Sequence, residues 1–243
     1  MPKTKVSLVL PCYNEAEHFK ESSIFILNTL KKSHYPFEII FVEDKSQDNT
    51  AYLIKEFIKT HKTEQLKVIY LSKNMGRGNA VTKGIISSQG KFVGFMDIDC
   101  EVSPKYIPQF IEKLNQGYDV VCGKRLYQIS VTGFIRALVS KIYSLIMKIL
   151  LGTKLEDTEA GYKFFKKDKI APVLNNVFDQ GWFWDTEFMV RAEKQDLKIV
   201  FLPVVFDRRT DKTSTVNLWS DSIDYIKKLI VFKKQLWSED HEK

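Results

Sequence analysis

The feature that most constrains the fold of this chain is a regular alternation of two apolar patterns along its first half. Short apolar runs bounded by turn residues are typical of buried strands, and they recur at Val6–Leu10, Phe37–Val42, Leu66–Leu71, Phe92–Met96 and Val120–Cys122. Between them, apolar residues follow a helical period at Glu15–Lys32, Asn49–Lys62, Gly78–Ser88 and Lys105–Gln116. Because strands that alternate with helices build a mostly parallel sheet with helices on its faces, the sequence predicts an α/β fold. After Gly123 the alternation stops, and we expect substrate-specific elements there.

Polar residues follow four of the predicted strands directly. They are Pro11-Cys12-Tyr13-Asn14-Glu15, Glu43-Asp44, Asn74 and Asp97-Ile98-Asp99. Ligands of an open parallel sheet bind beyond the carboxyl ends of its strands. We therefore expect these groups to converge on one edge of the sheet and form a binding site.

Asp97 and Asp99 are the clearest chemical signal at that edge. They flank one residue after a predicted strand, so their carboxylates would repel each other unless a positive charge lies between them. Mg²⁺ or Mn²⁺, held by one or two carboxylates and completed by diphosphate oxygens, suits this pair, and Glu101 is a candidate third ligand. Solvated acids in a loop are the alternative, because the Asp-x-Asp pattern alone is weak.

Several motifs in sequence order resemble those of family 2 glycosyltransferases, which have the GT-A fold. They are Pro11-Cys12-Tyr13-Asn14-Glu15, Glu43-Asp44-Lys45-Ser46-Gln47-Asp48-Asn49-Thr50 and Met96-Asp97-Ile98-Asp99. The likeness is greatest to dolichol-phosphate mannose synthases and related polyprenyl-phosphate sugar transferases, and it runs from Val6 to Val216. It implies a Rossmann-like GT-A sheet and an inverting, metal-dependent enzyme. Such an enzyme moves a sugar from GDP-mannose or a UDP-sugar to a polyprenyl or dolichyl phosphate.

The resemblance also implies roles for individual residues. Residues that match nucleotide-sugar contacts are Pro11, Tyr13, Glu15, Val42, Asp44, Asp97, Ile98, Asp99, Arg125 and Arg209. Those that match acceptor contacts are Arg136, Ser140, Lys163 and Ser214. We expect one domain over residues 1–243, in which residues 1–122 bind the nucleotide sugar and residues 123–243 bind the acceptor.

The chain departs from the family pattern at several positions. Glu101 stands where the family usually has Gln, which leaves the preferred metal open because an extra carboxylate binds a cation but repels the diphosphate. Lys45 changes the turn after the acid pair, while Lys212 and Thr215 replace the glycine and lysine of a phosphate-binding loop. In Asn74–Ala80 the glycines fit a structural turn or a phosphate-cradling loop, with Arg77 a candidate to face the donor.

The choice of acceptor decides whether the reaction needs a base. A polyprenyl phosphate is already an anion near neutral pH, so it needs alignment and positive charge rather than deprotonation. A sugar hydroxyl of a glycan or glycolipid would need a general base, for which Asp157 and Asp185 are the candidates. Capping of helices is the alternative role for both acids. Asp97, Asp99, Arg125, Asp157 and Asp185 are thus the candidate catalytic residues.

Two amphipathic helices are expected in the second half, at Phe134–Leu151 and Asn217–Trp237. Their basic and aromatic residues beside wide apolar arcs suit a membrane interface, while a core helix and a dimer surface are the alternatives. No apolar run reaches the ~20 residues that span a bilayer. We therefore expect a cytoplasmic protein, peripheral on the cytoplasmic face of a membrane, with a homodimer or a membrane-anchored partner left open.

The net charge of +7 favours an anionic partner, but the basic residues form no stripe of the kind that binds nucleic acid. A non-catalytic protein that binds nucleotide sugars or membranes is the remaining alternative, because the family pattern is not kept at every position.

Overall fold

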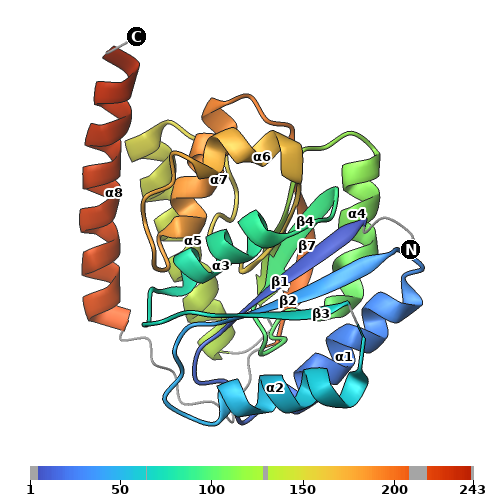
Figure 1. The fold of residues 1–243 in the computed structure, drawn as a ribbon. Helices are drawn as coiled ribbons and strands as arrows, with labels where there is room; N and C mark the ends of the chain where they lie inside the picture. The colour runs from blue at the N-terminus through green and yellow to red at the C-terminus, as the bar shows by residue number, and fades with distance from the viewer. Residues whose placement is uncertain (1–4, 64, 128–130, 208–217, 242–243) are drawn as a thin grey trace.

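The computed structural model describes residues 5–63, 65–127, 131–207 and 218–241. Within these residues a seven-stranded sheet runs through the molecule, and helices cover both of its faces (Figure 1). The strands are β1 (Val6–Cys12), β2 (Phe37–Glu43), β3 (Leu66–Tyr70), β4 (Phe92–Met96), β5 (Val120–Tyr127), β6 (Tyr162–Lys166) and β7 (Ile199–Phe206). Their order across the sheet is β3-β2-β1-β4-β6-β5-β7. β6 is antiparallel to β4 and β5, whereas the other neighbouring strands are parallel.

The helices divide between the two faces of the sheet. Their bounds are α1 (Phe19–Lys32), α2 (Thr50–His61), α3 (Arg77–Ser87), α4 (Ile107–Asn115), α5 (Val131–Leu151), α6 (Lys167–Leu174), α7 (Trp184–Lys194) and α8 (Leu218–His241), with a 3₁₀ turn at Pro104–Tyr106 before α4. Side chains of α1, α2 and α4 form one core layer with the sheet. Those of α3, α5, α6, α7 and α8 form the other.

The central strands explain why the sequence shows uninterrupted apolar runs. Every residue of β1 and β2 is buried. Leu8 and Leu10 face the layer of α1, while Val9 between them faces the layer of α3. A parallel strand covered on both faces needs apolar side chains at successive positions, and not only at alternate ones.

The first half of the chain confirms the elements predicted from its apolar patterns. All five predicted strands are present as β1 to β5, and the four predicted helices as α1 to α4. The boundaries shift by a few residues, since α1 begins at Phe19 rather than at Glu15 and β5 extends to Tyr127.

The expectation that the alternation stops after Gly123 is wrong, because β6, α6, α7 and β7 continue it. Two residues hide the strands in the sequence. Lys163 interrupts the apolar run of β6, although its side chain is fully buried. Pro203 interrupts β7, where it is tolerated because β7 is an edge strand of the sheet, next to β5.

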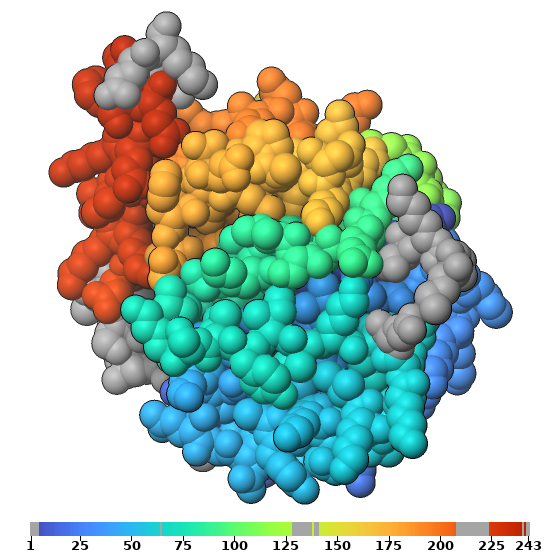
Figure 2. Space-filling model, in the orientation of Figure 1, coloured from blue at the N-terminus to red at the C-terminus, as the bar shows by residue number. Residues whose placement is uncertain are grey.

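The two predicted amphipathic helices are present as α5 and α8, which pack against each other, and α8 runs along one side of the molecule (Figures 1 and 2). Exposed apolar side chains on α5 follow one helical face, namely Leu138, Ile142, Leu145 and Ile149. In the described part of the chain, none of the helices combines the length and the apolar character that a bilayer crossing requires.

Candidate active site

The carboxyl ends of β1 and β2 bring the first two motifs together. The backbone N–H of Asp44 donates to the carbonyl of Cys12 at 2.9 Å. The N–H of Glu15 donates to the Thr50 hydroxyl at 2.8 Å, and that of Gln47 to Oδ1 of Asn14 at 2.7 Å. The two loops are therefore fixed to each other before any ligand binds.

Asp44 connects this pair of loops to the start of α3. Its carboxylate is buried and accepts hydrogen bonds from the backbone N–H groups of Met75 at 2.7 Å and Gly76 at 2.8 Å. Burial raises the pKa of Asp44, and these two hydrogen bonds oppose the shift. The residue predicted to contact the nucleoside thus holds the glycine loop in place.

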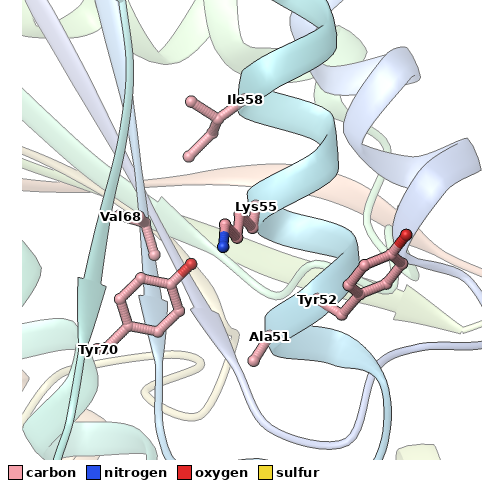
Figure 3. A pocket seen from close by; sticks show the side chains of 6 residues that line it. All are labelled: Ala51, Tyr52, Lys55, Ile58, Val68 and Tyr70. Carbon is pink, nitrogen blue, oxygen red and sulfur yellow. The ribbon is translucent and has the colours of Figure 1, made fainter.

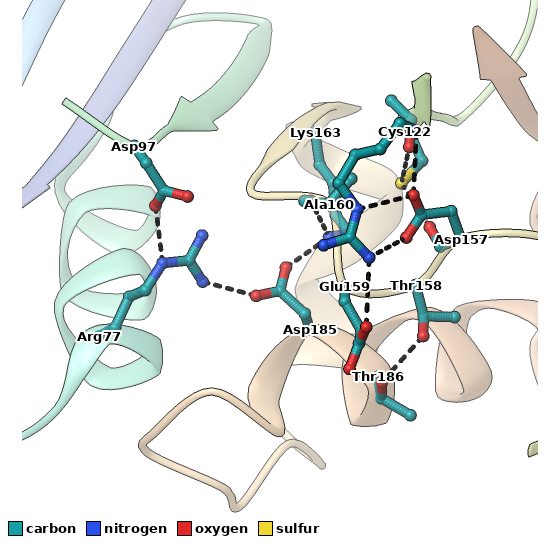
Figure 4. Close-up of polar contacts among 12 residues, drawn as sticks. Arg77, Asp97, Cys122, Asp157, Thr158, Glu159, Ala160, Lys163, Asp185 and Thr186 are labelled. Atoms are coloured by element: carbon teal, nitrogen blue, oxygen red, sulfur yellow. Dashed lines mark hydrogen bonds and ion pairs between the residues drawn. The ribbon is translucent and has the colours of Figure 1, made fainter. Parts of the chain in front are cut away.

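Arg77, the first residue of α3, places its guanidinium between Asp97 and Asp185 (Figure 4). Its Nε donates to Oδ1 of Asp97 at 2.7 Å, and its Nη1 donates to Oδ2 of Asp185 at 2.5 Å. The guanidinium carbon lies 5.3 Å from the ring centre of Phe95 and 4.9 Å from that of Trp182. Arg77 therefore joins the end of β4 to the start of α7.

Lys163 continues this chain of charges from the antiparallel strand β6. Its Nζ donates to Oδ1 of Asp185 and to the carbonyl of Ala160 (Figure 4). Asp185 thus has a cation on each carboxylate oxygen, in the first turn of α7 where the helix dipole also favours a negative charge. The N-cap residue of α7 is Phe183, so the alternative role as a helix cap does not describe Asp185.

Arg125 and the segment that follows α5 form a second charged cluster. Arg125 donates from Nε and Nη2 to the two carboxylate oxygens of Asp157, each at 2.9 Å, and from Nη2 to Oε2 of Glu159 at 3.2 Å. Burial alone would raise the pKa of Asp157, but Arg125 holds it below its ordinary value. Burial raises the pKa of Glu159. The same guanidinium opposes this shift but does not cancel it.

A group of hydroxyls lies beside this cluster. The Thr186 hydroxyl is within hydrogen-bond distance of the hydroxyls of Thr158, Tyr143 and Tyr225, at 2.8, 3.1 and 3.0 Å. These contacts join α5, α7 and α8 to the segment that carries Asp157. They therefore help to hold in place the acids that pair with Arg125.

A family model for glycosyl transferase family 2 matches residues 7–174, which is most of the chain. This chain is a family 2 glycosyltransferase. The match runs from β1 to β6. It therefore includes Asp97, Asp99, Arg77, Arg125 and Lys163.

Curated members of the family resemble the chain over most of its length. The glycosyltransferase AglD of Haloferax volcanii is 26% identical over 213 residues, which are 85% of this chain and 34% of that protein. A dolichyl-phosphate beta-glucosyltransferase of Dictyostelium discoideum is 26% identical over 82% of this chain and 65% of its own length. Another, from Trichomonas vaginalis, is 25% identical over 98% of this chain and 76% of its own length. This glycosyltransferase therefore spans only a third to two thirds of the first two relatives.

Solved structures confirm the GT-A fold. Glucosyl-3-phosphoglycerate synthase from Mycobacterium tuberculosis, in complex with Mn²⁺, UDP and glucosyl-3-phosphoglycerate, superimposes with a TM-score of 0.68 at 16% identity, over 95% of this chain and 78% of that one. Its complex with Mn²⁺, UDP-glucose and phosphoglyceric acid gives a TM-score of 0.70 at 18% identity, over 96% and 80%. At this level of identity the likeness shows the fold alone.

The carboxylates of Asp97 and Asp99 suit a divalent cation that takes further ligands from phosphate oxygens. Burial raises the pKa of Asp97, Arg77 opposes that shift, and the charge of Asp99 adds to it. No group of three or more His, Cys, Asp or Glu side chains in the described residues is arranged to hold a metal, so Glu101 does not complete a preformed cage. Mg²⁺ and similar ions need only one or two carboxylates when phosphate oxygens supply further ligands.

The remaining predicted site residues differ in what the structure says of them. Tyr13 is exposed at the edge. The side chains of Val42 and Ile98 are buried in the core, so any contact of theirs with a ligand has to come from the backbone. Arg209 and Ser214 lie outside the described residues, as do the side chains of Arg136 and Ser140.

One hollow in the described structure lies apart from these charges. It measures about 550 Å³, lies between α2 and β3, and is lined by Ala51, Tyr52, Lys55, Ile58, Val68 and Tyr70 (Figure 3). It is shallow and mostly apolar, and no acid is among its lining residues. It therefore lacks the carboxylates that would bind the cation of a nucleotide sugar.

The sequence pointed to Asp97, Asp99, Arg125 and Lys163, but two features of the site escaped it. Glu159 is not among the predicted site residues, although it is the acid of the cluster whose pKa is raised. Arg77 was considered only as a group facing the donor, whereas it pairs with Asp97 and Asp185. Their neighbours in space lie far away in sequence, so no local pattern reveals these pairs.

Proposed function

We propose that this chain transfers a hexose from a nucleotide diphosphate sugar to the phosphate of a polyprenyl or dolichyl phosphate. The observation that carries the proposal is the state of the two acids that were candidate bases. Asp185 has a cation on each carboxylate oxygen, and Asp157 forms a two-point ion pair with Arg125. The carboxylate oxygens of both acids are thus paired with cations, which suits an acceptor that needs no deprotonation.

The relatives support the same acceptor. Two of them are named dolichyl-phosphate beta-glucosyltransferases and align over 82% and 98% of this chain. Their names also make UDP-glucose the first donor to test, ahead of GDP-mannose and UDP-N-acetylglucosamine.

In the proposed reaction, a phosphate oxygen of the acceptor attacks the anomeric carbon of the sugar, and the bond from that carbon to the nucleoside diphosphate breaks with inversion. The acceptor oxygen is already an anion, so the two substrates have to be aligned rather than deprotonated. Asp97 and Asp99 would hold Mg²⁺ or Mn²⁺, which when bound neutralises the diphosphate that leaves. The exposed Tyr13 and the backbone beside the buried Asp44 would receive the nucleoside.

The cationic side chains of the site have separate tasks. Arg125 lies at the carboxyl end of β5 on the side of the acceptor half, and its two-point pair with Asp157 fixes the plane of the guanidinium. A fixed guanidinium suits an acceptor phosphate. Lys163 is fully buried and pairs with Asp185, so its task is to hold Asp185 rather than to contact the acceptor itself.

The exposed face of α5 supports peripheral contact with the membrane that contains such an acceptor. Leu138, Ile142, Leu145 and Ile149 are about half to two-thirds exposed, at 49, 50, 58 and 71%. Lys141 and Lys148 on the same helix are exposed as well. An apolar helical face flanked by lysines suits a lipid surface with anionic headgroups.

A hydroxyl acceptor on a glycan or glycolipid remains the second candidate because of Glu159. Burial raises its pKa and the charge of Asp157 adds to that shift, and a raised pKa makes a carboxylate a stronger base. In that case Glu159→Gln would abolish transfer, whereas transfer to a lipid phosphate would survive this substitution with a modest loss.

The deciding experiment measures transfer of labelled sugar from UDP-glucose, GDP-mannose and UDP-N-acetylglucosamine to a polyprenyl phosphate, with Mn²⁺ or Mg²⁺ present. Label that enters the organic phase only with metal, and not with Asp99→Asn, would support the proposal and identify the donor. If a donor binds but no lipid product forms, the lipid-phosphate acceptor is excluded and hydroxyl acceptors follow.

A further inference from the structure

One nitrogen of the Arg77 guanidinium takes part in neither of its two ion pairs. Nε is bound to Asp97 and Nη1 to Asp185, whereas Nη2 is buried and has no hydrogen-bond partner within the described residues. The Arg77 side chain is only 10% exposed. A buried N–H group without a partner is costly, so its presence at a site indicates a ligand that completes it.

The surroundings of Arg77 keep that nitrogen directed toward Asp97. A Cβ atom on Gly161 would lie 2.6 Å from Nη2 of Arg77 and 2.0 Å from Oδ2 of Asp97, so both polar atoms border the space that the glycine leaves open. Phe95 and Trp182 lie near the guanidinium, and Asp185 holds it from the side of α7. Arg77 is thus fixed beside the carboxylate proposed to bind the cation.

A positive charge at this place has opposite effects on the two parts of the donor complex. A cation that binds Asp97 has to approach a guanidinium whose Nε is 2.7 Å from the same carboxylate, so the two positive charges repel each other. A nucleoside diphosphate brings negative charge and acceptor oxygens that Nη2 lacks in this structure. It therefore offsets the repulsion and satisfies the unpaired N–H.

We propose that Arg77 is an internal counter-ion of Asp97 that makes binding of the divalent cation depend on the nucleoside diphosphate. The cation alone binds weakly because Arg77 already neutralises Asp97. The diphosphate binds Arg77 through Nη2, and the cation then binds tightly to the same complex. This inference rests on the proposed function, since it takes the edge at Asp97 and Asp99 as the donor site.

Asp185 acts as a positioning residue in this arrangement. It contacts neither the cation nor the donor, but its ion pair with Nη1 keeps the guanidinium from swinging away from Asp97. Lys163 on the other oxygen of Asp185 fixes that carboxylate in turn.

The test measures binding of Mn²⁺ to the full chain through the electron paramagnetic resonance signal of free Mn²⁺, with and without UDP or GDP. For the unmodified chain we expect each nucleotide to raise the Mn²⁺ affinity by about 10- to 100-fold, the range typical of coupled sites. With Arg77→Gln we expect Mn²⁺ alone to bind at least about tenfold more tightly, and the nucleotide alone to bind more weakly. These opposite changes distinguish a counter-ion from a residue that merely supports the fold, whose loss would weaken both ligands.

Arg77→Lys is the matched control, because it keeps the charge and loses the two-sided fork. We expect its affinity for Mn²⁺ alone to stay close to that of the unmodified chain. Mn²⁺ that binds Arg77→Gln no more tightly than the unmodified chain would overturn the proposal. If Arg77→Gln does not fold, the unmodified chain still tests the proposal. Equal affinity for Mn²⁺ with and without nucleotide would contradict the proposal. These measurements record binding alone. They therefore test this proposal even if the chain transfers no sugar to a lipid phosphate.

Discussion

Arg125 and Asp157 form a two-point ion pair, in which Nε and Nη2 of the arginine each lie 2.9 Å from a different carboxylate oxygen. The backbone N–H of Arg125 donates to the same carboxylate at 3.0 Å. Three hydrogen bonds thus join the carboxyl end of β5 to the segment before β6, and they fix the position of a guanidinium that we assign to the acceptor phosphate. Because Arg125 binds both carboxylate oxygens of Asp157, the geometry argues against a role for Asp157 as a base.

Replacing Asp157 with Asn should therefore reduce both stability and transfer without changing how transfer depends on pH. Removing one partner of a largely buried ion pair costs about 3–5 kcal/mol, because the other charge stays buried and uncompensated. Urea unfolding measures the loss of stability, and the rate of transfer is then followed from pH 5 to 9. If Asp157 were the base, the unmodified enzyme would show an acidic limb that Asp157→Asn lacks.

Replacing Gly161 with Ala should impair the site more than the fold. The added Cβ would lie 2.0 Å from Oδ2 of Asp97, so the carboxylate or the loop has to move. A displacement of about 1 Å at reacting groups can lower the rate about 100-fold. Gly181→Ala is the matched control, since its Cβ would meet its nearest neighbour, Oδ1 of Asp179, at an ordinary 3.5 Å. Equal activity of the two variants would show that the position of Asp97 is not critical.

Stability should fall in acid partly through Glu38. Burial alone would raise the pKa of this carboxyl, but hydrogen bonds from Lys67, the Ser7 hydroxyl and the backbone of Gln89 bring it below the ordinary value. A carboxyl whose pKa is lower in the folded state stabilises the fold above its unfolded pKa, and this contribution disappears as the pH falls through the folded value. The loss should therefore begin near pH 5 and continue below about pH 4, the ordinary range of a glutamate.

Glu38→Gln provides the measurement for this prediction. At pH 7 we expect the variant to be less stable than the unmodified chain by about 1–2 kcal/mol, because charge-assisted hydrogen bonds are lost. In urea unfolding at pH 4 and below, that difference should shrink. A difference that stays constant over the whole pH range would mean that Glu38 is not ionised in the folded chain.

The apolar face of α5 should bind lipid vesicles. In the double variant Ile142→Ser with Ile149→Ser, two side chains that are 50% and 71% exposed lose most of their apolar surface. Because burying a full isoleucine side chain gains about 1.5–3 kcal/mol, the partition coefficient should fall at least about tenfold. Sedimentation with vesicles of phosphatidylcholine and phosphatidylserine measures it. Ile86→Ser on α3, where the isoleucine is 63% exposed, is the control. Equal binding of both variants would exclude this face as the lipid contact.

The sequence by itself determined the fold class and the edge of the sheet where the proposed donor site lies. Buried parallel strands need apolar residues at successive positions, so β1, β2 and β4 are visible as runs, and the polar residues that end them have to meet at one edge. Asp97 and Asp99 could be found because their signal is local, two acids directly after a strand. The family motifs added Arg125 and Lys163 to the same site.

Only the tertiary structure decided what those charged groups do. Asp185 is 108 residues from Arg77 and 22 from Lys163, and both pair with it because β6 enters the sheet antiparallel, between β4 and β5. A buried ion pair leaves no periodic pattern, since its energy comes from the distance between two charges in a medium of low polarity and not from their spacing along the chain. The sequence therefore offers Asp185 only as a candidate acid, while the fold places it between Arg77 and Lys163, with a cation on each carboxylate oxygen.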